Sequence, residues 1–105
     1  MFETKKKSNQ EIVLIISGSM TGDAVRLFEK ALDSLQSSSY RIITLDLTKV
    51  LDVSSLFIGH ILQCHKNLAV QNRVIRICGY PDSVGDIMRM LNVHDAIQMV
   101  KEPVT

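Results

Sequence analysis

Apolar and polar residues follow two different repeats along this chain, one typical of strands and one typical of helices. A run of β-branched and aliphatic residues over Glu11–Ser17 predicts a strand covered on both faces, and we expect Gly18 to end it because glycine accepts backbone reversals. Alternating or continuous apolar patterns predict four further strands, the first of them at an edge. These are Phe2–Lys6, Arg41–Leu47, Val74–Cys78 and Ala96–Val100.

Between the strands, apolar residues recur every three or four positions, which is the period of a helix with one buried side. Helices are predicted from about Thr21 to Gln36 and from Ser54 or Ser55 to Val70. A third, short helix is predicted to start at a Ser83 cap, with Asp86 completing an approximate capping box. The expected buried positions are Val25, Phe28, Ala31, Leu32 and Leu35, then Ile58, Ile61, Leu62, His65, Leu68 and Ala69, then Val84, Ile87, Met88 and Leu91.

The order of these elements predicts the fold class. Strands that alternate with helices require crossover connections, which are right-handed in nearly all cases and place helices against a sheet. We therefore expect an α/β fold with a four- to five-stranded mixed, mostly parallel sheet and three to four helices packed on it. A length of 105 residues supports a single domain over residues 1–105 and is too short for a doubly wound dinucleotide fold.

Composition and charge exclude several classes of protein. Apolar residues make up 46% of the chain and the formal net charge is +1, so neither disorder nor direct nucleic-acid binding is expected. Met1 is followed by Phe2-Glu3-Thr4 and then lysines rather than by the apolar stretch of a signal peptide, and no apolar run approaches the ~18 residues that span a bilayer. We expect a cytoplasmic protein without membrane insertion, with Cys64 and Cys78 as buried, inert thiols.

The motifs of common enzyme classes do not occur in the sequence. No glycine-rich phosphate-binding pattern and no nucleophile elbow is present. His60 and His65 lie five residues apart on a predicted helix, which turns them about 140° from each other and argues against a shared metal. The sequence thus predicts a protein that is no enzyme and uses no cofactor or metal.

The junction between the Arg41–Leu47 strand and the second helix carries the polar residues of most interest. A short loop is expected at Thr48–Val53, and Ser54 at the helix start can offer its hydroxyl to free backbone N–H groups. Taken alone, Ser54 is explained by a simple N-cap, and Asp52 by a loop residue that bonds its own backbone.

The order of residues at this junction resembles a known family. Leu45-Asp46-Leu47 followed by Asp52-x-Ser54-x-Leu56 is similar to the STAS domains of anti-anti-sigma factors (anti-sigma factor antagonists), in which an L-D-L strand precedes D-S-S-G-L-G or D-T-S-G at a helix start. Ile16–Thr21 and Ile87–Val93 are similar to two further segments of that family. The resemblance extends over roughly residues 2–101.

The resemblance implies which residues form the site. Asp52 matches the motif aspartate and Ser54 the phosphoacceptor serine, with Ser55 as the alternative acceptor. Ser55 stands where the family usually has glycine and Phe57 where it often has a small residue, so their bulk can obstruct a partner kinase or simply pack differently. The expected partner-binding residues are Ser19, Thr21, Asp52, Val53, Ser54, Ser55 and Phe57.

The resemblance also implies a function, that of a bacterial anti-sigma factor antagonist. Such a protein binds an anti-sigma factor with a kinase-type ATP-binding fold, frees a sigma factor, and is switched off when the kinase phosphorylates its serine. The alternative is a STAS scaffold or regulatory subunit, stressosome-like or a partner of a transporter ATPase, that acts without phosphorylation. A small-ligand carrier is a third class, suggested by the polar residues Ser19, Thr21 and Asp52. We expect a monomer or weak dimer.

Overall fold

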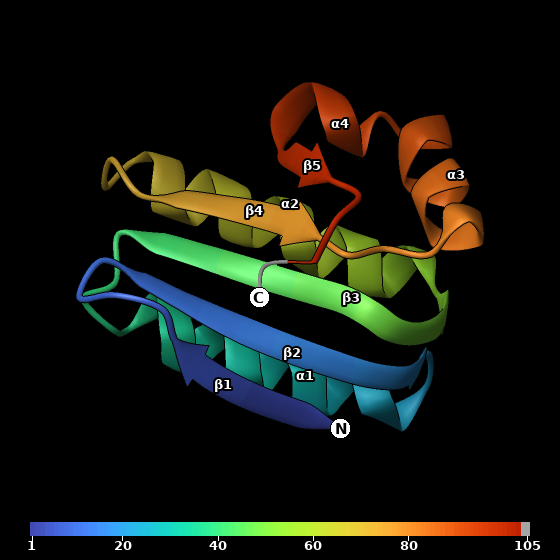
Figure 1. Ribbon diagram of the computed structural model, residues 1–105, viewed down its shortest axis with the longest axis horizontal. Coiled ribbons are helices and arrows are strands. Elements are labelled where there is room, and N and C mark those ends of the chain that lie inside the picture. Colours follow the sequence, from blue (N-terminus) through green and yellow to red (C-terminus); the bar gives the residue numbers. More distant parts are fainter. Residues whose placement is uncertain (104–105) are drawn as a thin grey trace.

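Five strands form one mixed sheet in the computed structural model, which describes residues 1–103 (Figure 1). Their order across the sheet follows their order along the chain, with the first pair antiparallel and the other pairs parallel. The predicted mixed, mostly parallel sheet is therefore confirmed. The strands are β1 (Phe2–Lys6), β2 (Glu11–Met20), β3 (Ile42–Val53), β4 (Val74–Cys78) and β5 (Gln98–Val100).

The helices lie in the connections between the parallel strands. In Figure 1, α1 and α2 pack side by side behind the sheet, while the chain that follows β5 crosses the near face. Right-handed crossovers that step in one direction along a sheet place their helices on the same face. Over residues 1–103, no helix has both the length and the apolar character that a bilayer crossing requires. The helices are α1 (Asp23–Gln36), α2 (Ser55–Ala69), α3 (Asp82–Met90) and α4 (Val93–Ala96).

The hydrophobic core lies between the sheet and the helices. In β4 and in β2 and β3 up to their register shifts, alternate residues are buried in it, which is the period of two that strands impose. Phe28 of α1 and Phe57 of α2 meet there with their ring centroids 4.4 Å apart. The strand residues of this core are Ile12, Leu14, Ile16, Met20, Ile43, Leu45, Leu47, Val50, Ile75 and Ile77.

The predicted buried sides of the first two helices agree with the structure except at one position. Ala69, at the end of α2, is exposed. Cys64 and Cys78 are buried, as predicted. The confirmed positions, of which Ala31, Leu62 and His65 are half-buried, are Val25, Phe28, Ala31, Leu32, Leu35, Ile58, Ile61, Leu62, His65 and Leu68.

Two predictions about strand ends are wrong, and both concern the same edge of the sheet. β2 continues past Gly18 to Met20, and β3 continues through the expected loop 48–53 to Val53. The two strands stay paired in this region, although β3 carries an extra residue at each of two register shifts. Gly18, with φ at 99°, lies next to one of these shifts inside the strand. Pairing with a distant strand, which local sequence does not reveal, keeps both segments extended.

The predicted start of α3 is also wrong, and its predicted buried side is right only at Val84 and Met88. α3 begins at Asp82, the preceding Pro81 occupies the N-cap position, and no side chain caps the helix. Asp86 lies 3.7 Å from the Arg89 guanidinium instead of completing a capping box with Ser83.

Tyr80 explains why the buried side of α3 is rotated from the predicted one. Its ring lies against Gly85, where an added Cβ would be 2.6 Å from the ring carbons. Val84, Gly85 and Met88 are therefore buried, whereas Ile87 and Leu91 are exposed. After α3, the short helix α4 was not predicted, and it contains Ala96, so that the last strand begins at Gln98.

Candidate functional site

The last residues of β2 and β3 lie next to each other at one edge of the sheet. Ser19 is paired with Asp52, and Met20 with Val53. Immediately after these pairs, β2 leads into α1 and β3 leads into α2, so both helices begin at this edge (Figure 1). Tertiary structure thus brings together two of the segments that were singled out separately in the sequence.

Ser54 is the N-cap of α2, and its side chain is already used in hydrogen bonding. Its hydroxyl accepts a hydrogen bond from the Phe57 N–H at 3.2 Å and donates one to the Met20 carbonyl at 3.0 Å. The Ser54 N–H donates to the same carbonyl at 3.1 Å. Half-buried Ser54 therefore joins the start of α2 to the end of β2.

Ser55 differs from its neighbour in both exposure and bonding. It is the first residue of α2 and is exposed. Within residues 1–103 its hydroxyl makes no hydrogen bond, so it is available to another molecule.

Phe57 lies beneath this edge rather than on its surface. Its side chain is 0% exposed and packs against Phe28. The large ring therefore fills the core between α1 and α2, which leaves it out of reach of a binding partner. Of the two interpretations of its bulk, obstruction of a partner or different packing, the geometry agrees with packing.

Two leucines that the sequence reasoning missed accompany the polar residues here. Leu51 is 73% exposed and Leu56 is 61% exposed. Leu51 is the extra residue of β3 between the pairs Gly18–Val50 and Ser19–Asp52. In the sequence, the exposure of Leu51 could have been inferred only from its position next to buried Val50 in a strand. That inference requires the knowledge that β3 continues past Leu47. We call the exposed set the junction surface; it comprises Ser19, Thr21, Leu51, Asp52, Ser55 and Leu56.

Neither of the two hollows described below lies at the junction surface. Among the described residues, no group of three or more His, Cys, Asp and Glu side chains could hold a metal ion. Two hollows are found elsewhere, one of about 70 Å³ and one of about 160 Å³. Both are smaller than the roughly 300 Å³ at which typical ligand pockets begin.

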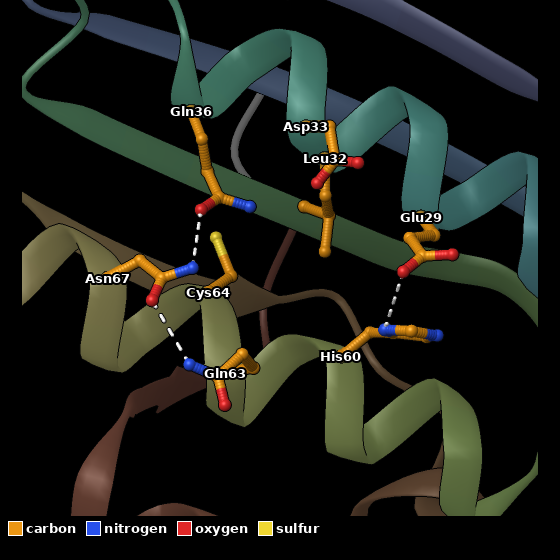
Figure 2. Close-up of a pocket in the computed structure, with 8 residues that line it drawn as sticks. All are labelled: Glu29, Leu32, Asp33, Gln36, His60, Gln63, Cys64 and Asn67. Atoms are coloured by element: carbon orange, nitrogen blue, oxygen red, sulfur yellow. Dashed lines mark hydrogen bonds and ion pairs between the residues drawn. The ribbon is translucent and has the colours of Figure 1, made fainter.

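The smaller hollow lies between α1 and α2, and two polar contacts join side chains of the two helices across it (Figure 2). His60 Nδ1 lies 3.7 Å from a Glu29 carboxylate oxygen, and the Asn67 amide donates to Gln36 at 2.9 Å. Cys64 faces this space, and burial raises the pKa of its thiol to about 11, the nearby Asp33 adding to the rise and Arg73 opposing it. A thiol with so high a pKa is protonated at neutral pH, so it is a poor nucleophile there.

Comparison with known proteins identifies a family for this chain. Residues 3–101 match the family model described as "Mlab, STAS domain". Among curated proteins, no sequence matches significantly.

Several solved structures share the fold at low sequence identity. An anti-sigma factor antagonist from Mycobacterium paratuberculosis superposes with a TM-score of 0.86 at 11% identity, over 95% of this chain and 84% of that one. A putative anti-sigma factor antagonist from Thermotoga maritima gives 0.85 at 18% identity, over 94% and 85%. The phosphorylated form of the Bacillus cell fate determinant SpoIIAA gives 0.74 at 10% identity, over 94% and 90%. At these identities the likeness concerns the fold.

Proposed function

The chain belongs to the STAS domain family, and from this premise we propose that it is an anti-sigma factor antagonist that binds an anti-sigma factor through the junction surface. The partner is an ATP-binding protein of the kinase type, and its capture releases a sigma factor. Phosphorylation of a serine at the start of α2 ends the interaction. The observation that carries this proposal is the exposed junction surface, located where the family motif places its serine.

The exposed leucines support a protein partner rather than a small molecule. Leu51 and Leu56 present apolar side chains on either side of Asp52 and Ser55 along the chain. Protein interfaces combine a desolvated apolar centre with a polar rim. Because Phe57 and Phe28 pack directly beneath, the start of α2 is held rigidly and can offer this surface with little loss of conformational freedom.

Phosphorylation at this position would act on the interface more than on the fold. A phosphate adds about −1.5 to −2 charges, which the positive end of a helix tolerates. The formal charge of the whole chain would change from +1 to about −1. A partner surface that faces Leu51 and Leu56 would have to desolvate this dianion next to Asp52, which strongly disfavours binding.

The test is affinity capture from the cells that produce the protein, followed by binding measurements with the purified partner. We expect Leu56→Gln to weaken binding by about tenfold or more, as for a residue at an interface centre. Val70→Gln is the matched control, because Val70 is 85% exposed at the far end of the same helix. Equal affinity of both variants, or a captured partner unrelated to ATP-binding kinases, would contradict the proposal.

The bonding of Ser54 favours a second candidate, a regulatory subunit that acts without phosphorylation. The serine that matches the family's phosphoacceptor is engaged with Met20 and Phe57, as a purely structural cap would be. Capture of a transporter ATPase, together with a chain that carries no phosphate, would support this candidate over the first.

A further inference from the structure

We propose that two copies of this chain associate through β1, edge to edge, and join their sheets into one across a two-fold axis. This association is separate from the proposed function, because β1 contributes no residue to the junction surface. Three features of the molecule support it: free backbone groups along β1, the order of charges on β1, and an apolar side of α1 beneath the strand.

The outer edge of β1 offers backbone groups that β2 does not use. β1 is the outermost strand of the sheet, and within residues 1–103 no strand lies beyond it (Figure 1). The Lys7 N–H donates to the Glu11 carbonyl at 3.0 Å, which fixes the phase of the ladder between β1 and β2. Because bonding alternates along antiparallel strands, odd-numbered residues of β1 bond to β2 and even-numbered residues point outward. The outward N–H and C=O groups are those of Phe2, Thr4 and Lys6.

An antiparallel second copy uses all of these groups when the pair of strands is centred on Thr4. Thr4 then faces Thr4 of the second copy, and Phe2 faces Lys6, so each outward group finds a partner. Between these pairs, Glu3 faces Lys5 at a non-hydrogen-bonded position, where Cα atoms are about 4.5 Å apart and side chains are closest. The two-fold axis repeats the contact, so each copy contributes one glutamate and one lysine to it.

The charges on β1 select this register over its neighbours. A shift of two residues in one direction places Glu3 opposite Glu3, and a shift in the other direction places Lys5 opposite Lys5. Like charges directly opposite each other destabilise a pair of strands. Lysines on an edge strand also discourage pairing with unrelated strands. A strand that presents a carboxylate opposite Lys5 therefore fits this edge, and a second copy of β1 is such a strand.

The helix beneath this edge turns an apolar side chain away from the rest of the molecule. Phe2 stacks on Phe28 of α1 with ring centroids 6.2 Å apart, so α1 passes beneath β1. Glu29 lines the hollow between α1 and α2 and thus marks the side of α1 that faces α2. Leu27 lies about 160° around the helix from Glu29, on the opposite side. Its side chain is 49% exposed, although it is large and apolar.

The same two-fold axis brings this side of α1 towards its copy. Ala24 and Ala31 lie one turn before and one turn after Leu27, on the same side of the helix. Their small side chains permit a close approach of two helices, since the distance between helix axes depends on the side chains at the contact. Contact between the two copies would remove Leu27 from water, which favours association.

Sedimentation velocity of the full chain, up to millimolar concentration, tests for this dimer. We expect the mass to rise towards twice that of one chain with concentration. Glu3→Lys places lysine opposite Lys5 at both contacts, so the dissociation constant should rise about tenfold or more. Combining Glu3→Lys with Lys5→Glu restores opposite charges and should restore the affinity. The control is Lys66→Glu, the same charge change at an exposed position on α2. A monomer at every concentration, or no rescue by the double variant, would overturn the inference.

Disulfide crosslinking tests the register. In Thr4→Cys the two thiols meet at the axis with Cα atoms about 5.5 Å apart, within the range of a disulfide. The native cysteines Cys64 and Cys78 are buried, so they should not compete. We expect oxidised glutathione to convert most of this variant into covalent dimers. Lys6→Cys is the control, because its two copies would lie about 13 Å apart along the strands. Equal crosslinking of the two variants would contradict the register.

Thr4→Pro separates loss of the dimer from loss of the fold. Proline removes the N–H at position 4, which points away from β2, and edge strands tolerate proline with this orientation. We expect the dimer to be lost, while the unfolding midpoint of the dilute, monomeric chain stays within a few degrees of the unchanged protein. A dimer that persists in Thr4→Pro would show that the copies meet elsewhere, and the inference would be wrong.

Discussion

The two ends of the α1–α2 pair use their polar groups in opposite ways. At the end where both helices finish, Arg73 donates hydrogen bonds to the carbonyls of Leu35, Gln36 and Tyr40 at 2.8–3.2 Å. At the end where both helices begin, Ser54 provides the one side-chain cap, while α1 has none. At the finishing end, carbonyl groups are hydrogen-bonded by the Arg73 side chain. At the starting end, backbone N–H groups, the Ser55 hydroxyl and the side chains of Leu51 and Leu56 face solvent. The starting end is therefore the part of the fold suited to binding another protein.

The largest effect is expected beneath the junction surface, from Phe57→Ala. Removing this fully buried ring leaves a cavity against Phe28, and unfolding in urea should show a loss of about 3–5 kcal/mol. Leu56→Ala, one residue earlier but exposed, should change stability by less than about 0.5 kcal/mol. Similar losses of stability for the two variants would contradict the distinction between buried Phe57, which supports the fold, and exposed Leu56, which is available to a partner.

A smaller loss is expected at the finishing end, from Arg73→Ala. This change removes the charged donor from carbonyls at the end of α1, and we expect a loss of about 2–3 kcal/mol in urea unfolding with partner affinity unchanged. The control is Arg26→Ala, because Arg26 is exposed and makes a surface pair with Asp23 at 3.8 Å. Weakened partner binding by Arg73→Ala would contradict the assignment of partner binding to the starting end alone.

The two serines provide a finer test within the starting end. Ser54→Ala removes the cap and the bond to Met20, so the free energy of unfolding should fall by about 1–2 kcal/mol. Ser55→Ala removes a hydroxyl with no partner in the described chain, so its effect should be within about 0.5 kcal/mol. Thermal and urea unfolding of both variants measure the difference, and a reversed order would contradict the assignment of Ser54 as the structural cap.

The smallest effect is expected at Asp82, the first residue of α3. A hydrogen bond and the positive charge of Lys101 hold the pKa of this carboxyl below its ordinary value of 3.8. Because the pKa is lower in the folded chain than in the unfolded chain, any stabilisation by this contact is present above pH 3.8 and is lost as the pH falls through the folded pKa. A carbon NMR titration should place the midpoint below 3.8, and Lys101→Ala should return it toward that value. Both groups are exposed, so no measurable change in the stability of the fold is expected at neutral pH.

Much of the fold could be predicted because its signals are local. The continuous apolar run of β2, the strand patterns of β3 and β4 and the helical period in α1 and α2 were enough for the sheet, the order of elements and most buried positions. The weaker signals were misleading in α3, where the buried side depends on a contact between Tyr80 and Gly85. That contact reflects packing, and no repeat in the sequence encodes it.

The candidate site was predicted in part for the same reason. Ser54 at the start of α2 follows from a local cap, so its position was readable from the sequence. The pairing of Ser19 with Asp52 depends on the extension of β2 and β3, which the sequence alone did not indicate. The exposure of Leu51 depends on a register shift in that same extension.

The periodic elements, the family motif and the residue that caps α2 can all be read from the sequence, because each depends on neighbours a few positions away. Which of these residues face solvent depends on how the sheet and helices pack. Ser54 is occupied by Met20, 34 residues earlier in the chain, and Phe57 is covered by Phe28 from another helix. Such partners meet only when the sheet and helices pack together. The difference between a bound Ser54 and an open Ser55 therefore became visible in three dimensions and not before.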